Sequence, residues 1–141
     1  MHELGLSLLI QMSRITNAIH GDTSRMLVQY GLTLSQFGVL EVLYHKGDLT
    51  VGEVQRKILS STGTMPVIVK NLEKRNLLTR NVSEEDRRQV VLSLTEEGRT
   101  LVQQVFPENK AMILEYFSVL TEAEQKELLG LLKKACPRKY R

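Results

Sequence analysis

The most chemically specific run in this sequence is Asp86-Arg87-Arg88, where a carboxylate is followed by two guanidinium groups. It lies between two β-type runs, Leu77 to Val82 and Gln89 to Leu94, so a hairpin is expected with these charges at its tip. A guanidinium binds phosphate in a bidentate manner and also suits the negative potential of a narrow DNA minor groove. Most charged turns of this composition simply face solvent, so the run favours nucleic acid as the ligand only when a helix-turn-helix precedes it.

A second group of candidate contacts precedes the hairpin. Ser60, Ser61 and Gly63 separate two short helical patterns, the second of which extends to about Arg75. Two short helices joined in this way form a helix-turn-helix, and the start of the second helix meets base edges in the major groove. The predicted DNA contacts in this region, with the two lysines on phosphates, are Ser61, Thr62, Thr64, Met65, Lys70 and Lys74. Ser61 or Thr62 could instead serve only as the N-cap of the helix.

The helices that position these residues are marked by capping boxes of the type Thr-x-x-Glu/Gln, which begin at Thr33, Thr50 and Thr121. Apolar periodicity predicts a long helix over residues 4–30, with a bend or break expected near Gly21-Asp22, and a support helix over residues 34–45.

Another long helix is expected from Thr95 towards Val119, and Pro107 predicts either a kink in it or two abutting helices. A final helix follows Thr121, and a short extra strand is expected near Asp48-Leu49. The predicted fold class is mainly α with a small β-hairpin wing: a winged helix-turn-helix with additional N- and C-terminal helices.

The composition fits one globular domain, because the chain has 141 residues, of which 42% are hydrophobic and 25% charged. The net charge of +3 does not itself demand a nucleic-acid partner, but the basic residues cluster between Arg56 and Arg88. Cys136 is the single cysteine, so no internal disulfide can form. Neither a signal peptide nor a membrane-spanning run is evident, and we expect a soluble, cytoplasmic protein.

Three motifs together resemble the MarR family of transcriptional regulators. The run Asp86-Arg87-Arg88, five further residues and then Leu94-Thr95-Glu96-Glu97-Gly98 is similar to the family's wing signature. The segments Leu34 to Leu40 and Leu72 to Leu77 also fit its pattern. Pro66 departs from it, because a threonine or serine is common there; a proline is tolerated in the first helical turn, but one hydroxyl contact with DNA is lost.

The resemblance implies a single domain with a defined division of roles. Residues 1–30 and 96–141 would supply dimerisation helices, and residues 31–95 the DNA-binding lobe. Arg88 would enter the minor groove, Asp86 would steady it, and Arg87 would reach a phosphate. The implied function is a homodimeric repressor on a pseudo-palindromic operator, released by a small-molecule effector. The resemblance suggests an effector pocket at His20, Tyr30, Phe37 and Tyr44, although aromatic residues at such places are more often part of the core.

The alternative functions have less support in the sequence. The three histidines are widely separated, and no Gly-rich phosphate loop, H-E-x-x-H or C-x-x-C motif is present, which disfavours an enzyme, a metal sensor and any cofactor. Redox sensing by an N-terminal cysteine is disfavoured because no cysteine precedes Cys136. A winged-helix module that binds protein instead of DNA is the remaining alternative, and such a module would not need an arginine-tipped wing.

Overall fold

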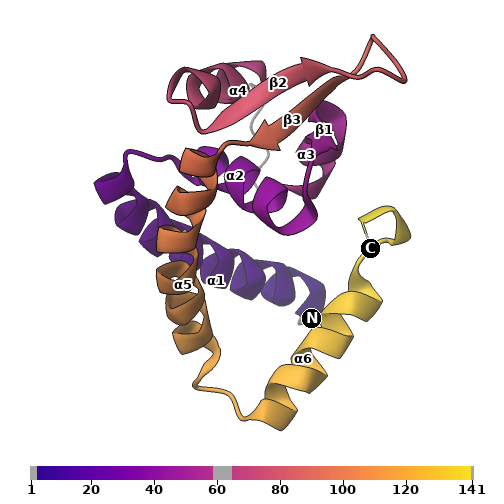
Figure 1. The fold of residues 1–141 in the computed structure, drawn as a ribbon. Helices are drawn as coiled ribbons and strands as arrows, with labels where there is room; N and C mark the ends of the chain where they lie inside the picture. The colour runs from indigo at the N-terminus through magenta and orange to yellow at the C-terminus, as the bar shows by residue number, and fades with distance from the viewer. Residues whose placement is uncertain (1–2, 59–64, 141) are drawn as a thin grey trace. The chain divides into compact units, whose positions relative to one another are not determined.

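A computed structural model describes residues 3–58 and 65–140 of the chain. The chain divides into two compact units, Met1–Asn109 and Lys110–Arg141. In chain order the elements are α1 (Leu4–Leu27), the 3-10 helix η1 (Val28–Tyr30), α2 (Leu34–Lys46), β1 (Leu49–Thr50), α3 (Val51–Lys57), α4 (Met65–Lys74), β2 (Leu78–Val82), β3 (Val90–Leu94), α5 (Glu96–Phe117), α6 (Glu122–Ala135) and the 3-10 helix η2 (Arg138–Tyr140), as Figure 1 shows. The predicted fold class, a mainly α winged helix-turn-helix, is confirmed.

The predicted capping boxes begin three of these helices. At α2, α3 and α6 the threonine hydroxyl accepts a hydrogen bond from the backbone N–H three residues later, and the side chain there accepts one from the threonine N–H. Each box satisfies two of the backbone donors that a helix start leaves without intrahelical partners. Gly31 ends η1 in the left-handed conformation, with φ 65°, which glycine adopts without strain.

The two expected interruptions do not divide their helices. The helix α1 continues through Gly21 and Asp22, so the predicted break there was wrong. A single glycine costs only about 1 kcal/mol relative to alanine inside a helix, which flanking helical turns can offset. The helix α5 likewise continues through Pro107, so the alternative of two abutting helices is also wrong. Buried Val102 and Val105 fix the turn before the proline against the core.

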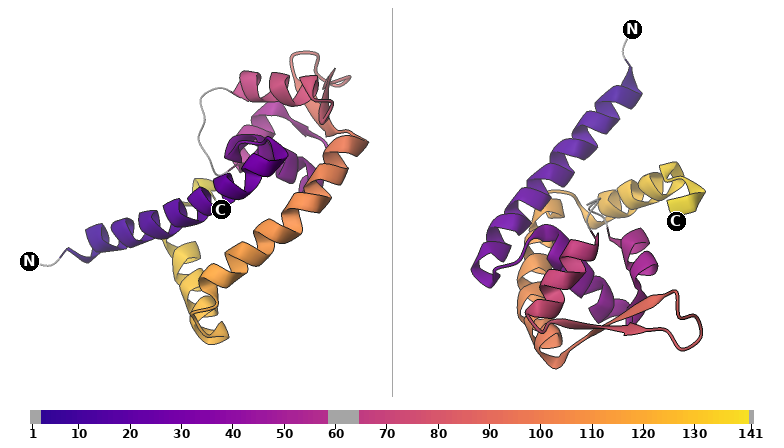
Figure 2. Two further views of the ribbon diagram at one scale, coloured as in Figure 1. Left: turned by 90° about the vertical axis from the view of Figure 1, so that its left-hand side faces the viewer. Right: turned by 90° about the horizontal axis from the view of Figure 1, so that it is seen from above.

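The sheet has three antiparallel strands in the order β1-β3-β2. Leu78 pairs with Leu94 and Val82 with Val90, which confirms the predicted hairpin, with each strand beginning one residue later than expected. The predicted extra strand is β1, in which Leu49 pairs with Leu92. The hairpin extends beyond the helices of its unit, so its tip lies away from the core (Figures 1 and 2).

The core of the first unit lies between the sheet, α2, α4 and the first part of α5. Its fully buried side chains are Leu27, Val39, Leu40, Val54, Val69, Leu72, Leu78, Leu92, Val102 and Val105. This core fixes α4 on one side of the sheet, because α4 and β2 both contribute buried leucines to it. Among the described residues, no single helix is long and apolar enough to cross a membrane.

Candidate nucleic-acid interface

The helix α4 has one buried and one exposed face. Residues recurring at helical spacing on the inner face are buried in the core: Met65, Ile68, Val69 and Leu72. The outer face carries the exposed residues Pro66, Val67, Lys70, Asn71 and Lys74. Both lysines that were expected on phosphates therefore lie on the outer face, four residues apart along one side of the helix.

Met65 does not fit its predicted role. Its side chain is 2% exposed and packs in the core, so it does not reach a base edge in this structure. The reason is helical phase: Met65 lies three and seven residues before Ile68 and Leu72 and shares their face. That spacing is visible in the sequence, but the apolar Val67 two residues later allows a different side of the helix to be buried. The outer face instead presents Val67 and Asn71. Three other predicted contacts, Ser61, Thr62 and Thr64, lie outside the described residues.

The wing tip brings together two of its three predicted residues. The Asp86 Oδ1 atom accepts hydrogen bonds from the Arg88 backbone N–H at 3.1 Å and from the Arg88 Nε–H at 3.2 Å. The Arg88 side chain is 91% exposed, so this ion pair contributes little to stability, but it restricts the guanidinium orientation. Arg87 is exposed beside it. A turn held by Ser83, whose N–H donates to Gln89 O at 2.9 Å, supports the tip.

An ion pair links α4 to the wing. Arg80 Nε on β2 lies 3.3 Å from Glu73 Oε1 on α4, and both side chains are partly exposed. Such a surface pair is worth at most about 1 kcal/mol. Its geometric effect is to connect the lysine-bearing helix with the strand that leads to Arg88.

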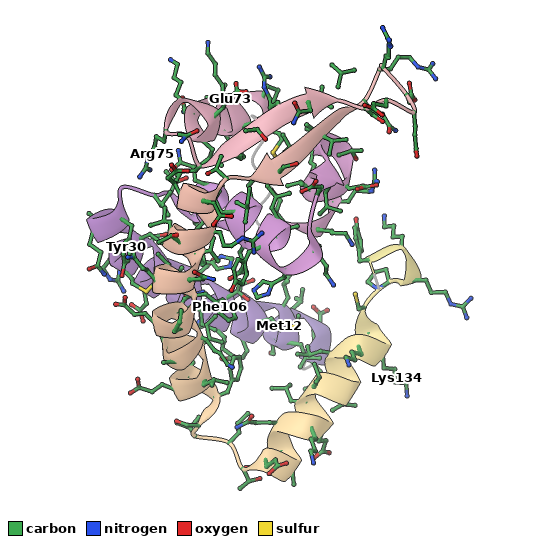
Figure 3. The ribbon with its side chains drawn as sticks, viewed as in Figure 1. Met12, Tyr30, Glu73, Arg75, Phe106 and Lys134 are labelled. Atoms are coloured by element: carbon green, nitrogen blue, oxygen red, sulfur yellow. The ribbon has the colours of Figure 1, made fainter. Side chains whose placement is uncertain are left out.

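The other end of α4 is fixed by Arg75, a connection that the sequence analysis missed. Its guanidinium donates hydrogen bonds to Gly31 O at 2.7 Å and to Tyr30 O at 3.1 Å, beside the end of η1 (Figure 3). A cation at the end of a helix satisfies carbonyls that have no intrahelical partner and interacts favourably with the helix dipole. The Tyr30 hydroxyl in turn donates to Glu108 on α5 at 3.1 Å. Desolvation, with Glu108 as a second cause, raises the pKa of Tyr30.

The four residues proposed for an effector pocket have different surroundings. Phe37 is 3% exposed and belongs to the core, which is the alternative role expected for aromatic residues at these places. Tyr30 and Tyr44 are partly buried against that core. Tyr44 packs edge-on against His45 and lies beneath the Arg99 guanidinium, 5.7 Å from the ring centre. His20 is half-buried on α1.

One buried polar contact joins α1 to α5. The Thr23 hydroxyl donates to Asn109 Oδ1 at 3.0 Å, and both residues are buried. Glu41 on α2 is half-buried, and desolvation raises the pKa of its carboxyl group despite the opposing effect of His45.

Comparison with known proteins agrees with this geometry. A family model described as transcriptional regulator SarA/Rot matches residues 23–105. The HTH-type transcriptional regulator MhqR of Bacillus subtilis is 37% identical over 134 residues, covering 95% of this chain and 92% of that protein.

Two of the solved structures that share the fold illustrate the likeness. One is MarR from E. coli in its apo form, with a TM-score of 0.74, 24% identity and coverage of 97% of this chain and 98% of that one. The other is BpsR of Bordetella bronchiseptica, whose DNA binding is regulated by 6-hydroxynicotinic acid; its TM-score is 0.82 at 24% identity, with 96% of each chain covered.

Proposed function

We propose that this chain, which belongs to the MarR family of transcriptional regulators, acts as a homodimeric repressor on a pseudo-palindromic operator. The observation that carries the proposal is the cationic surface formed by two linked elements. Lys70 and Lys74 line the outer face of α4, and Arg88 stands at the wing tip, where Asp86 braces it. A helix and an arginine-tipped hairpin of this kind fit adjacent major and minor grooves of one duplex.

Each group has a distinct role in this proposal. The lysines neutralise phosphates beside the major groove, which positions α4 without reading sequence. Arg88 enters the minor groove, where Asp86 keeps its side chain extended from the tip, and Arg87 contacts a phosphate. Ser61, Thr62 and Thr64 stay candidate contacts of this interface. A cytoplasmic location follows from the proposal, because the DNA is there.

Exposed apolar surface supports the homodimer. The first half of α1 presents a run of aliphatic side chains that are 44 to 67% exposed: Leu4, Leu6, Leu8, Leu9, Ile10, Met12 and Ile15. This half of the helix extends beyond the rest of its unit in Figure 2. In the second unit, α6 and the end of α5 line a groove of about 400 Å³ with Leu114, Phe117, Leu128, Leu129 and Leu132. Monomers rarely expose apolar surface of this extent, and a second copy of the chain would cover it.

An effector is part of the proposal as well. A small molecule bound beside His20, Tyr30 and Tyr44 would act on Tyr30, whose hydroxyl bonds to Glu108 on α5 and whose carbonyl accepts a hydrogen bond from Arg75 at the end of α4. Binding there would change the position of α4 and release the DNA. For a repressor, the operator overlaps the promoter, so that the bound dimer occupies the site that polymerase needs.

The proposal is tested with fluorescence anisotropy titrations against duplex DNA from upstream of the protein's own gene, at two salt concentrations and beside a scrambled duplex. Arg88→Ala should weaken binding to the native duplex by about 1–3 kcal/mol and make the dependence on salt shallower. The matched control is Arg138→Ala, which removes an arginine of η2 and should leave the affinity unchanged.

Equal affinities of wild type and Arg88→Ala would contradict the role of the wing. Absence of any binding at low salt would contradict DNA binding itself and favour the alternative, a winged-helix module that recognises another protein.

A further inference from the structure

Val67 is an exposed apolar side chain in the first turn of α4, next to Pro66 and one turn before Lys70. It lies on the outer face of α4 and is 54% exposed. Lys70 and Lys74 follow it by three and seven residues, so all three lie along one side of the helix. The buried residues Ile68 and Leu72 occupy the opposite face. Val67 is therefore centred on the direction in which α4 faces away from the core.

A single exposed valine is ordinary on a protein surface. This one differs because it precedes two lysines on the same side of the helix. On a duplex, the long lysine side chains would reach phosphates at the rim of a groove, whereas the short valine, one turn nearer the start of the helix, would face the groove itself. The first turns of a recognition helix come closest to base edges.

The chemistry of valine restricts what it can recognise there. Its side chain has no hydrogen-bond donor or acceptor, so it gains nothing from the polar edges of guanine, cytosine or adenine. The apolar group that a base pair presents in the major groove is the C5-methyl of thymine. We infer that Val67 reads the C5-methyl group of a thymine, so that each half-site of the operator carries a T·A pair opposite the first turns of α4. This inference rests on the proposed function.

Because burial of one methyl group is worth a factor of about four in an equilibrium constant, removing the thymine methyl should weaken binding about fourfold per half-site. In a two-fold symmetric complex the effect multiplies to about fifteenfold when both half-sites are changed.

The experiment begins by selecting a preferred duplex from a random library with the wild-type protein. Each thymine of that duplex is then replaced by deoxyuridine, which removes only the methyl group and keeps every hydrogen-bonding group. Affinities are measured for wild type, for Val67→Ala, and for the control Val28→Ala, which shortens another exposed valine, on η1. Because both valines are exposed, both variants should fold, and circular dichroism verifies this.

We expect one thymine position, repeated by symmetry in the two half-sites, at which replacement by deoxyuridine lowers the affinity of wild type and of Val28→Ala about fourfold per half-site. At that position Val67→Ala should bind the thymine and uracil duplexes equally. The inference would be overturned if no uracil substitution lowered the affinity of the wild-type protein, or if Val67→Ala lost as much affinity as wild type on substitution. Either result would leave the proposed function intact. A library that yields no preferred sequence would overturn both.

Discussion

Replacing Gly98 by alanine should destabilise the protein more than any other substitution of a helical glycine described here. Gly98 lies in the first turn of α5, and its N–H donates to the Thr95 hydroxyl at 3.0 Å. A Cβ atom at this position would lie 2.0 Å from Leu77 O, and 3.0 Å from both Leu77 C and Leu94 Cδ2. The nearest atom belongs to the backbone, so a side-chain rotation cannot relieve the clash.

The cost can be bounded from the contacts. The Leu77 carbonyl accepts a hydrogen bond from the Thr95 N–H at 3.2 Å, so moving it away from the new methyl group weakens the junction between β2 and α5. Overpacking of this kind typically costs about 1–3 kcal/mol, and a backbone clash belongs at the upper end. Alanine gains about 1 kcal/mol over glycine in a helix. The net loss should be about 2 kcal/mol.

Urea unfolding monitored by circular dichroism, at one protein concentration because dimer stability depends on it, measures this loss. The matched control is Gly130→Ala in α6, where nothing lies within 4 Å of the new Cβ atom. Its free energy of unfolding should rise by about 0.5–1 kcal/mol through helix propensity alone. A Gly98→Ala variant as stable as wild type would refute the inference that the close approach of the Leu77 carbonyl requires glycine at this position.

Two further predictions concern the body that supports α4. Arg75→Met should lower the free energy of unfolding by about 1 kcal/mol in the same urea assay, because it removes the exposed hydrogen bonds to Gly31 and Tyr30; an unchanged value would show that these bonds contribute nothing. Burial raises the folded-state pKa of Glu41 above its ordinary value of 4.5, so wild-type stability should fall as the pH rises through the interval between the two values. Glu41→Gln should therefore be more stable than wild type at pH 7 and lose this advantage at a pH below 4.5. Thermal unfolding at the two pH values measures the stability difference between variant and wild type, and a difference that is the same at both would contradict the prediction.

Features that depend on neighbouring residues were predictable from the sequence. The capping boxes at Thr33, Thr50 and Thr121 form as expected, because the threonine and its partner three residues later bond within one helical turn. The hairpin between Leu78 and Leu94 is also local, since a polar turn joins two runs that pair with each other. The ion pair of Asp86 with Arg88 spans only two residues.

Helix faces were only partly predictable. Periodicity shows that α4 has an apolar side, but a short helix with several apolar residues near its start permits more than one choice of which side is buried. Met65 is expected on the DNA face from the sequence, whereas the structure buries it and exposes Val67. The persistence of α1 through Gly21 and of α5 through Pro107 has a similar cause, because packing can outweigh a local preference.

The amino-acid sequence by itself determined the family, the order of helices and strands, and the charged wing tip, because these rest on short motifs and local hydrogen bonds. Only the tertiary structure decided which residues join distant segments. Arg75 bonds to Gly31 across 44 residues of sequence, and the Thr23 hydroxyl bonds to Asn109 across 86. Gly98 is required by the carbonyl of Leu77. No local pattern encodes such pairs, because the distance between their atoms is set by how the whole core packs.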